Sequence, residues 1–206
     1  MLIPSDQAAL FHEIYPSLLG FIAGKLGGVA GVSDRAGFTA ASFEKMAAVR
    51  NAILDHLPLL DDYAAQNPDG FGLDLLRQVK AWKHVVHGRF IVERDLKSHT
   101  VFLSSDGPAK AYAVLGLTTE IVHMLPLAPP VMVDAVLLPW RHQIICDGLI
   151  SAFNVVLGAG LRRSFREQYK EAKVSGQVIS CLDPDERGPV PTLGPRQLKG
   201  PRLFVS

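Results

Sequence analysis

The spacing of apolar residues changes along the chain from a helical period to an alternation of two, and this change constrains the fold more than any other feature. Before about residue 85, apolar side chains recur every three or four positions, as on one face of an amphipathic helix. From about Val85 they alternate, and Gly88 stands at the change. The sequence therefore predicts an α+β protein in which helices come before strands.

Three helices are expected in the first 85 residues. One begins near Ser5 or Asp6, the second near Ser42, and the third after the turn at 67–70. Pro16 marks either a kink in the first helix or the first turn of another one. The apolar stripes that define the three helices are Leu10, Ile14, Leu18 and Ile22, then Phe43, Met46, Val49, Ile53 and Leu57, then Leu73, Leu76, Val79 and Trp82.

Short segments rich in Val, Ile and Phe follow, and six strands are expected among them. Short connections favour antiparallel neighbours, and several short strands separated by turns favour a small barrel or a strongly curved sheet. A further helix and one short strand come next. The expected strands are 89–94, 100–104, 110–117, 131–138, 143–149 and 152–157, followed by a helix at 161–173 and a strand at 177–182.

We therefore predict N-terminal helices packed on a curved antiparallel sheet or small β-barrel, with a C-terminal helix. The expected division is a helical region at 1–85, a barrel-like region with its C-terminal helix at 86–182, and a Pro-rich tail at 183–206 that is extended or disordered. The excess of Lys and Arg over Asp and Glu is concentrated after residue 160, so this neutral chain has a basic end.

The composition bounds the class of protein. A chain of 206 residues with 48% hydrophobic and 20% charged residues can bury a core without disulfides or a metal. Its formal net charge of +1 gives no global attraction to nucleic acid or acidic membranes.

Cys146 and Cys181 lie in apolar runs without a CxxC pair, so both are expected to be buried thiols. Without a signal-peptide pattern or a spanning segment, the chain is expected to be cytoplasmic with no membrane partner.

Several apolar strings between roughly Trp82 and Gly160 resemble a group of bacterial proteins of unknown function. This resemblance implies a shared fold and carries no catalytic signature, so it implies no activity. The strings are Gly88-Arg89-Phe90-Ile91-Val92, Thr100-Val101-Phe102-Leu103, Tyr112-Ala113-Val114-Leu115-Gly116-Leu117-Thr118, Val136-Leu137-Leu138-Pro139-Trp140 and Ile144-Ile145-Cys146-Asp147-Gly148-Leu149.

Two aspartates are candidate catalytic residues. A four-residue turn at 139–142 would place Asp134 directly opposite Asp147 across a hairpin. Facing like charges cost about 0.2–1 kcal/mol, so this register needs a bound cation, a nearby Arg or Lys, or a shared proton. A carboxylate pair that shares a proton or a divalent metal could activate water for hydrolysis. A shifted register with a solvated Asp134 is the alternative.

The tip of the same hairpin is a candidate binding surface. If the turn is exposed, Trp140 lies beside Arg141 and His142 and contacts a partner. The alternative is that Trp140 covers an open end of the barrel.

A second candidate binding site lies where the C-terminal helix begins. Gly158 and Gly160 precede Arg162 and Arg163, and such a turn presents N–H groups and guanidinium groups to an anion. Arg166 continues a basic helix face that is able to contact nucleic acid through its phosphates. A structural turn followed by a solvated basic face is the alternative, and the third glycine of a dinucleotide motif is missing.

The remaining patterns are weaker. His84 and His87 are three residues apart without a third ligand, so no metal site is expected, and no cofactor motif is present. Because small barrels most often serve as binding scaffolds, we expect a non-enzymatic binding or adaptor module with a macromolecular or small-molecule partner. The alternatives are a hydrolase-like enzyme using Asp134 and Asp147, and a structural or self-associating subunit whose apolar run 125–133 supports a homo-oligomer.

Overall fold

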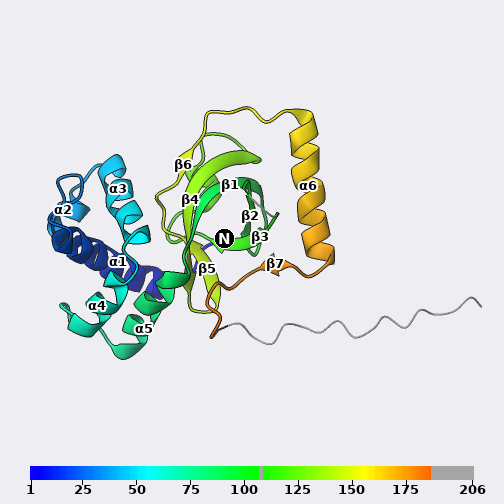
Figure 1. The fold of residues 1–206 in the computed structure, drawn as a ribbon. Helices are drawn as coiled ribbons and strands as arrows, with labels where there is room; N and C mark the ends of the chain where they lie inside the picture. The colour runs from blue at the N-terminus through cyan, green and yellow to red at the C-terminus, as the bar shows by residue number, and fades with distance from the viewer. Residues whose placement is uncertain (107–108, 187–206) are drawn as a thin grey trace, which may run out of the picture.

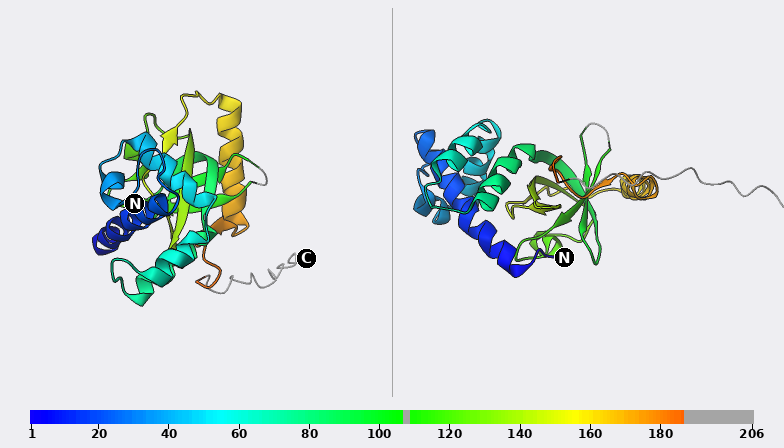
Figure 2. Two further views of the ribbon diagram at one scale, coloured as in Figure 1. Left: turned by 60° about the vertical axis from the view of Figure 1, so that its left-hand side comes forward. Right: turned by 90° about the horizontal axis from the view of Figure 1, so that it is seen from below.

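The computed structural model describes residues 1–106 and 109–186, and it confirms the α+β class. N-terminal helices precede a mostly antiparallel seven-stranded sheet that closes into a ring, and a C-terminal helix follows (Figure 1). The helices lie on one side of the ring and the last helix lies on the opposite side (Figure 2). Of the expected tail at 183–206, the part after Glu186 lies outside the described residues.

Five α-helices precede the first strand, where three were expected. The two additional helices, α2 and α4, are too short for a repeat of apolar residues to show in the sequence. Pro16 lies inside α1, which continues through it as one helix, and Pro4 rather than Ser5 occupies its N-cap position. The helices are α1 (Ser5–Lys25), α2 (Arg35–Thr39), α3 (Phe43–Leu54), α4 (Leu59–Gln66) and α5 (Leu73–Ala81), and the 3₁₀ turn η1 (Trp82–His84) follows.

Helix α1 is the centre of the helical layer, and α2 rests directly on it. A Cβ atom at Gly20 would lie 2.2 Å from the backbone nitrogen of Arg35, and a Cβ at Gly24 would lie 2.7 Å from the carbonyl oxygen of Ser33. Only glycine permits so close an approach of two backbones. The two glycines, one helical turn apart, therefore position the segment that leads into α2.

The substitution Gly20→Ala tests this contact. Although alanine favours helix more than glycine does, its methyl group would meet the Arg35 backbone, and we expect the free energy of unfolding to fall by about 2 kcal/mol. The matched control is Gly160→Ala in α6, where a Cβ meets no atom within 4 Å and the helix gains propensity. Urea denaturation should show destabilisation for the first variant only.

Seven strands and two further helical segments follow η1. Strands β1, β2, β3, β5 and β4 form the ring in that order, and β4 closes it by pairing with β1. The elements are β1 (Val86–Asp95), β2 (Thr100–Ser104), β3 (Ala111–Leu115), the 3₁₀ turn η2 (Ile121–Met124), β4 (Val131–Trp140), β5 (Gln143–Cys146), β6 (Ser151–Ala152), α6 (Ala159–Val174) and β7 (Val178–Ile179).

Two pairings within the mostly antiparallel sheet are parallel. Strand β3 pairs in parallel with β5 through Val114 and Leu115, and with β7 through Ala111 and Tyr112. The hairpin with β4 sets the direction of β5, because β4 is committed to β1 along its other edge. Closing the ring on β3 therefore leaves β5 parallel to it. The strand expected at 152–157 is wrong beyond residue 152, since β6 ends there.

The ring has an apolar interior and two covered outer faces. The interior contains Phe90, Phe102 and Leu137, which belong to one buried cluster. The outer face of β4 and β5 packs against the N-terminal helices, and the outer face of β1 and β2 packs against α6, where Tyr169 is the buried contact. The fold therefore has three parts side by side in space: the N-terminal helices, the barrel in the middle, and α6 on the far side.

Candidate functional site

The β4–β5 hairpin is tighter than expected. Trp140 pairs with Gln143 and Leu138 with Ile145, so the turn holds only Arg141 and His142. Arg141 adopts a left-handed conformation with φ 52°, which a two-residue hairpin turn commonly requires. The register is shifted by two residues from the one expected, which leaves each side chain on its expected face but changes every partner.

The predicted pairing of Asp134 with Asp147 is therefore wrong. Asp134 faces Arg89 in β1 on one side and Ser151 in β6 on the other. Asp147 follows the end of β5 and points toward the helical layer. The two carboxylates do not face each other across a ladder.

Trp140 is not an exposed partner contact, because its exposed fraction is 0%. Its ring centroid lies 5.5 Å from that of Phe11 and 6.2 Å from that of Trp82, and its indole N–H donates to Gln7 Oε1 at 3.2 Å. With a two-residue turn, Trp140 is the last strand residue and shares the face of Leu138, which packs on the helices. The prediction that Trp140 is exposed was wrong because it assumed a four-residue turn at 139–142, whereas the turn has two residues.

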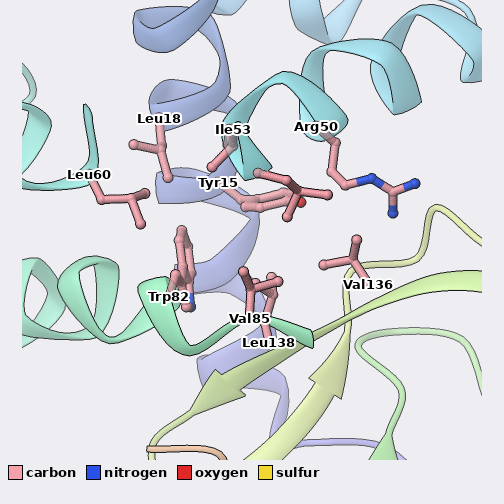
Figure 3. Close-up of a pocket in the computed structure, with 10 residues that line it drawn as sticks. Tyr15, Leu18, Arg50, Ile53, Leu60, Trp82, Val85, Val136 and Leu138 are labelled. Atoms are coloured by element: carbon pink, nitrogen blue, oxygen red, sulfur yellow. The ribbon is translucent and has the colours of Figure 1, made fainter. Parts of the chain in front are cut away.

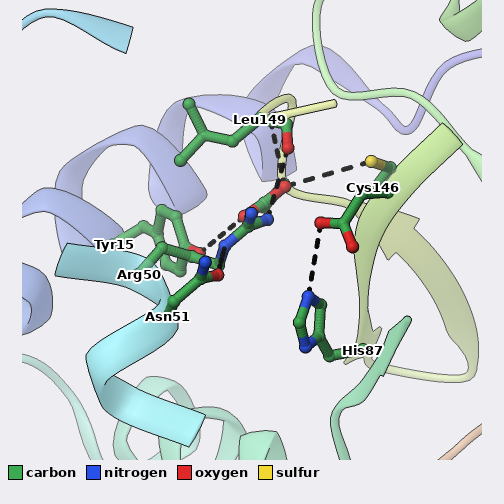
Figure 4. A network of polar contacts seen from close by, with 8 residues as sticks. Tyr15, Arg50, Asn51, His87, Cys146 and Leu149 are labelled. Carbon is green, nitrogen blue, oxygen red and sulfur yellow. Dashed lines mark hydrogen bonds and ion pairs between the residues drawn. The ribbon is translucent and has the colours of Figure 1, made fainter. Parts of the chain in front are cut away.

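Asp147 lies in a buried polar network between the helices and the barrel (Figure 4). Its Oδ2 accepts from Tyr15 Oη at 2.9 Å and from Arg50 Nη1 at 3.1 Å, and its Oδ1 accepts from the Leu149 amide at 3.0 Å. Arg50 Nε donates to Asn51 Oδ1 at 2.8 Å. The side chains of Arg50 and Asp147 are 3% and 0% exposed, so the ion pair is shielded from water.

Burial governs the protonation of this network. Burial raises the pKa of Asp147 above its ordinary value, while the Arg50 guanidinium and the donated hydrogen bonds oppose that rise. Burial and the Asp147 charge together raise the pKa of Tyr15 well above its ordinary value, so the phenol keeps its proton and acts as a donor. A buried ion pair of this kind holds elements in one arrangement and is costly to break from one side.

A small cavity adjoins the network on the helical side (Figure 3). It is lined by Tyr15, Arg50, Trp82 and Val136 among others, and its volume is about 20 Å³. The network therefore joins the two layers, and the cavity beside it has room for about one water molecule.

The substitution Arg50→Met tests the ion pair. It leaves the Asp147 carboxylate buried without a counterion, and we expect the free energy of unfolding to fall by about 3–5 kcal/mol at pH 7. Arg163→Met, which breaks the exposed pair of Arg163 with Glu167, is the control and should change it by less than about 1 kcal/mol.

The loss in Arg50→Met should also depend on pH. Without the guanidinium, the hydrogen bonds from Tyr15 and the Leu149 amide are the remaining opposition to burial, and burial, which already raises the pKa with Arg50 present, holds the folded-state pKa of Asp147 further above the unfolded value. The folded state then binds more protons than the unfolded state, so stability falls as pH rises. Urea denaturation of Arg50→Met should show less destabilisation near pH 4.5 than at pH 7, and a loss that is equal at both values would contradict the assignment of a buried charge.

Asp134 is placed differently. Its Oδ1 lies 3.3 Å from His87 Nε2, and both side chains are about one-third exposed. Asp134 thus has His87 as its neighbour, whereas Asp147 has Arg50. Within residues 1–106 and 109–186, no group of three or more His, Cys, Asp and Glu side chains is arranged to hold a metal ion. His84 and His87 are likewise separated, since the first ends η1 and the second lies in β1.

The two cysteines differ in accessibility. Cys146 is 1% exposed inside the barrel, and burial together with the Asp147 charge raises the pKa of its thiol. Cys181 is only half-buried, which corrects the expectation of two buried thiols. Neither forms a disulfide.

Thiol labelling should separate the two cysteines. At pH 8 in the native state, we expect an aromatic disulfide reagent to modify Cys181 and leave Cys146 intact, because a buried protonated thiol is a poor nucleophile. Peptide mapping after labelling identifies the site. Complete unfolding in urea should expose both thiols, and native labelling of Cys146 at a comparable rate would contradict the burial seen here.

Three buried or part-buried hydrogen bonds hold the hairpin tip against α5 and η1. Gln78 Nε2 and Trp82 Nε1 both donate to the Pro139 carbonyl oxygen, at 2.9 and 3.1 Å. The backbone N–H of Arg141 donates to Gln78 Oε1 at 2.7 Å. Gln78 therefore fixes the last strand residue and the turn together, and its role gave no signal in the sequence.

A groove of about 940 Å³ opens between α5, this tip and residues 183–186. Leu10, Phe71 and Leu75 supply half-buried apolar side chains, and the buried Trp140 also lines the groove. Arg141 and His142 lie along its edge, so two of the three residues predicted at the hairpin tip do line a recess. The groove is large enough for a ligand, unlike the cavity beside Asp147.

Charged side chains of both signs line the groove, and among them Asp74 and Arg77 of α5 pair with each other at 2.9 Å. Lys80, Lys83 and Arg141 line it, and among the described residues no carboxylate lies within 4.0 Å of any of the three. In the segment 183–186, Asp183 Oδ1 accepts from the Asp185 amide at 3.0 Å, and Glu186 Oε2 lies 3.9 Å from His142 Nδ1. Lys80, Lys83 and Arg141 are therefore available to an anionic group of a ligand, whereas Glu186 Oε2 is buried without a hydrogen bond.

The predicted anion site at the start of α6 lies on the other side of the barrel. Gly158 is the N-cap of α6, and Gly160 lies in its first turn. Arg162 Nε donates to the Leu157 carbonyl oxygen at 2.8 Å, and Arg163 pairs with Glu167 at 3.0 Å. Arg166 is exposed. These contacts use two of the three arginines within the chain, and an anion or nucleic-acid role for this turn stays a prediction.

The apolar run at 125–133 is divided by the fold. Val131 and Val133 enter the barrel interior, whereas Leu127 is 49% exposed. Self-association through this run also stays a prediction.

Comparisons of the chain with protein-family models, with curated proteins and with solved structures gave no match. The resemblance to bacterial proteins of unknown function is thus an expectation that these comparisons do not test. Among the helices that the structure describes, none has the length and apolar character needed to cross a membrane.

Proposed function

We propose that the protein is a non-enzymatic binding module that takes a peptide segment of a partner protein in the groove beside the hairpin tip. The observation that carries this proposal is the groove itself, with about 940 Å³ of space, an apolar floor and a rigidly held edge. Peptide-binding grooves commonly combine an apolar anchor site with a charged edge.

The charge of the edge favours an acidic segment. Lys80, Lys83 and Arg141 have no carboxylate neighbours among the described residues, so a peptide that carries Asp or Glu next to a large apolar side chain would meet both features of the groove. Nucleic acid fits less well, because a phosphate backbone carries a negative charge at every nucleotide and would have to pass Asp183, Asp185 and Glu186, whereas a peptide with one or two acidic residues is able to place them against the cations alone.

The hydrolase alternative has less support. It depends on Asp134 and Asp147 acting as a pair, and each has a separate partner, His87 for the first and Arg50 for the second. The groove needs no such pairing.

Selection of random linear peptides displayed on phage tests the proposal. We expect the enriched peptides to combine acidic and large apolar residues, and to bind the full chain in isothermal titration calorimetry. Reversing two edge charges with Lys83→Glu and Arg141→Glu should weaken binding about tenfold or more, which corresponds to about 1.4 kcal/mol. Leu75→Ala should weaken it through the apolar floor.

The matched control reverses two exposed charges on α6, with Lys170→Glu and Lys173→Glu. These substitutions change the net charge equally but lie on the opposite side of the barrel (Figure 1). Peptide binding that survives the groove substitutions, or that falls equally with the control, would overturn the proposal, as would the absence of any enriched peptide.

A further inference from the structure

The chain between β6 and α6 gathers exposed apolar side chains that elsewhere in the described residues occur singly. Phe153, Val155, Val156 and Leu161, here called the β6–α6 apolar surface, are 36%, 49%, 79% and 54% exposed. An isolated exposed apolar residue is ordinary, whereas a group of them marks an interaction surface. The other large apolar side chains exposed among the described residues are far apart along the chain: Met1, Phe43, Leu73, Leu127 and Val174.

The segment that carries this surface is anchored at both ends. The Phe153 amide donates to the Met132 carbonyl oxygen at 2.9 Å, just after β6. At the other end, Leu157 is 4% exposed under α6, and its carbonyl oxygen accepts from Arg162 Nε at 2.8 Å. In Figure 1 the chain between β6 and α6 forms the upper edge of the molecule. The apolar side chains are therefore presented to solvent at one end of the protein.

A stripe of cationic side chains on α6 begins where this segment ends. Its members, at spacings of four, four and three residues, are Arg162, Arg166, Lys170 and Lys173. Such spacings place side chains along one side of a helix. All four are exposed, and among the described residues no carboxylate lies within 4.0 Å of their charged groups. The protein is nearly neutral as a whole, but here positive charge lies beside an apolar surface.

From this combination we infer that the β6–α6 apolar surface and the basic stripe of α6 dock the protein on a bilayer that contains anionic lipids. The apolar side chains enter the boundary between headgroups and acyl chains, while the arginines and lysines attract anionic headgroups. The expectation of no membrane partner rested on net charge and on spanning segments. Docking on a surface depends instead on local charge and on exposed apolar side chains.

Nucleic acid matches only one of the two features. Phosphates would pair with the stripe, but a phosphate backbone leaves Val155, Val156 and Leu161 exposed to water, and aliphatic side chains offer no ring on which a base stacks. A second copy of the chain is also a poor match. In a symmetric pair the same patch of both copies meets, which brings the two positive stripes together.

The peptide groove lies at the other end of the molecule. In Figure 1, α5 and the residues before 186 lie near the lower edge, whereas the chain between β6 and α6 lies at the upper edge. Docking on a bilayer therefore leaves the groove accessible. The inference does not rest on the function proposed for the groove.

Co-sedimentation of the full chain with lipid vesicles tests the inference. We expect the wild type to bind vesicles of mixed phosphatidylserine and phosphatidylcholine, and to bind phosphatidylcholine alone about tenfold or more weakly, because the stripe then has no anionic headgroups to meet. Val155→Ser with Val156→Ser should weaken binding to the mixed vesicles about tenfold, and so should Arg166→Gln with Lys170→Gln. All four residues are exposed, so the thermal unfolding midpoint should stay near that of the wild type.

Matched controls lie on the N-terminal helices, on the opposite side of the barrel from α6 (Figure 2). Leu73→Ser removes a side chain that is 73% exposed, and Lys25→Gln with Lys45→Gln removes two exposed charges. These controls should leave vesicle binding unchanged. Loss of binding equal to that of the test variants would mean a general effect of charge or apolarity and overturn the inference.

Three further outcomes would also overturn it. The first is no binding of the wild type to the mixed vesicles. The second is binding of mixed-sequence RNA, in place of the vesicles, that Arg166→Gln with Lys170→Gln weakens. The third is self-association in sedimentation velocity that Val155→Ser with Val156→Ser abolishes, which would assign the surface to a second copy. The test variants leave the groove residues unchanged, so the two proposals succeed or fail separately.

Discussion

Strand β4 is buried on both faces, and the remaining elements are arranged around that constraint. Val133, Ala135 and Leu137 point into the barrel, whereas Val136 and Leu138 point into the helical core. A strand that is apolar on both faces must be covered twice. One cover is the closed ring of strands, and the other is the layer of N-terminal helices, so neither part has a complete core by itself.

Polar groups determine how the two layers meet. Apolar packing between α1, α3 and β4 is tolerant of small rotations, but the Asp147 carboxylate must meet Tyr15, Arg50 and the Leu149 amide at once. The Pro139 carbonyl imposes a second condition, because Gln78 and Trp82 both donate to it. These two anchor points, at opposite ends of the outer face of β4 and β5, fix the angle between helices and barrel and thereby the width of the groove.

The sequence predicted the class of fold because hydrophobic period is a local property. It predicted most of β1 to β5, and it missed α2 and α4 because one or two turns show no repeat. The candidate sites depended on the length of a turn and on contacts between residues that are far apart in the sequence. The length of one turn decided whether Trp140 was exposed, and Arg50, the ionic partner of Asp147, lies 97 residues away in α3. The groove combines four separated segments, so no pattern within any one of them indicates it.

Strand β3 has a further consequence for how the chain assembles. One end of the chain is tied beside it by the Ile3 amide, which donates to the Gly116 carbonyl oxygen at 3.0 Å, while β7 pairs with it at Ala111 and Tyr112. Leu182, just after β7, is part of the barrel interior. The first and nearly the last described residues thus complete the same wall. During synthesis, the strands of the ring and the surface that the early helices cover are complete once residue 146 has left the ribosome, but part of the apolar interior stays open until residue 182 has followed.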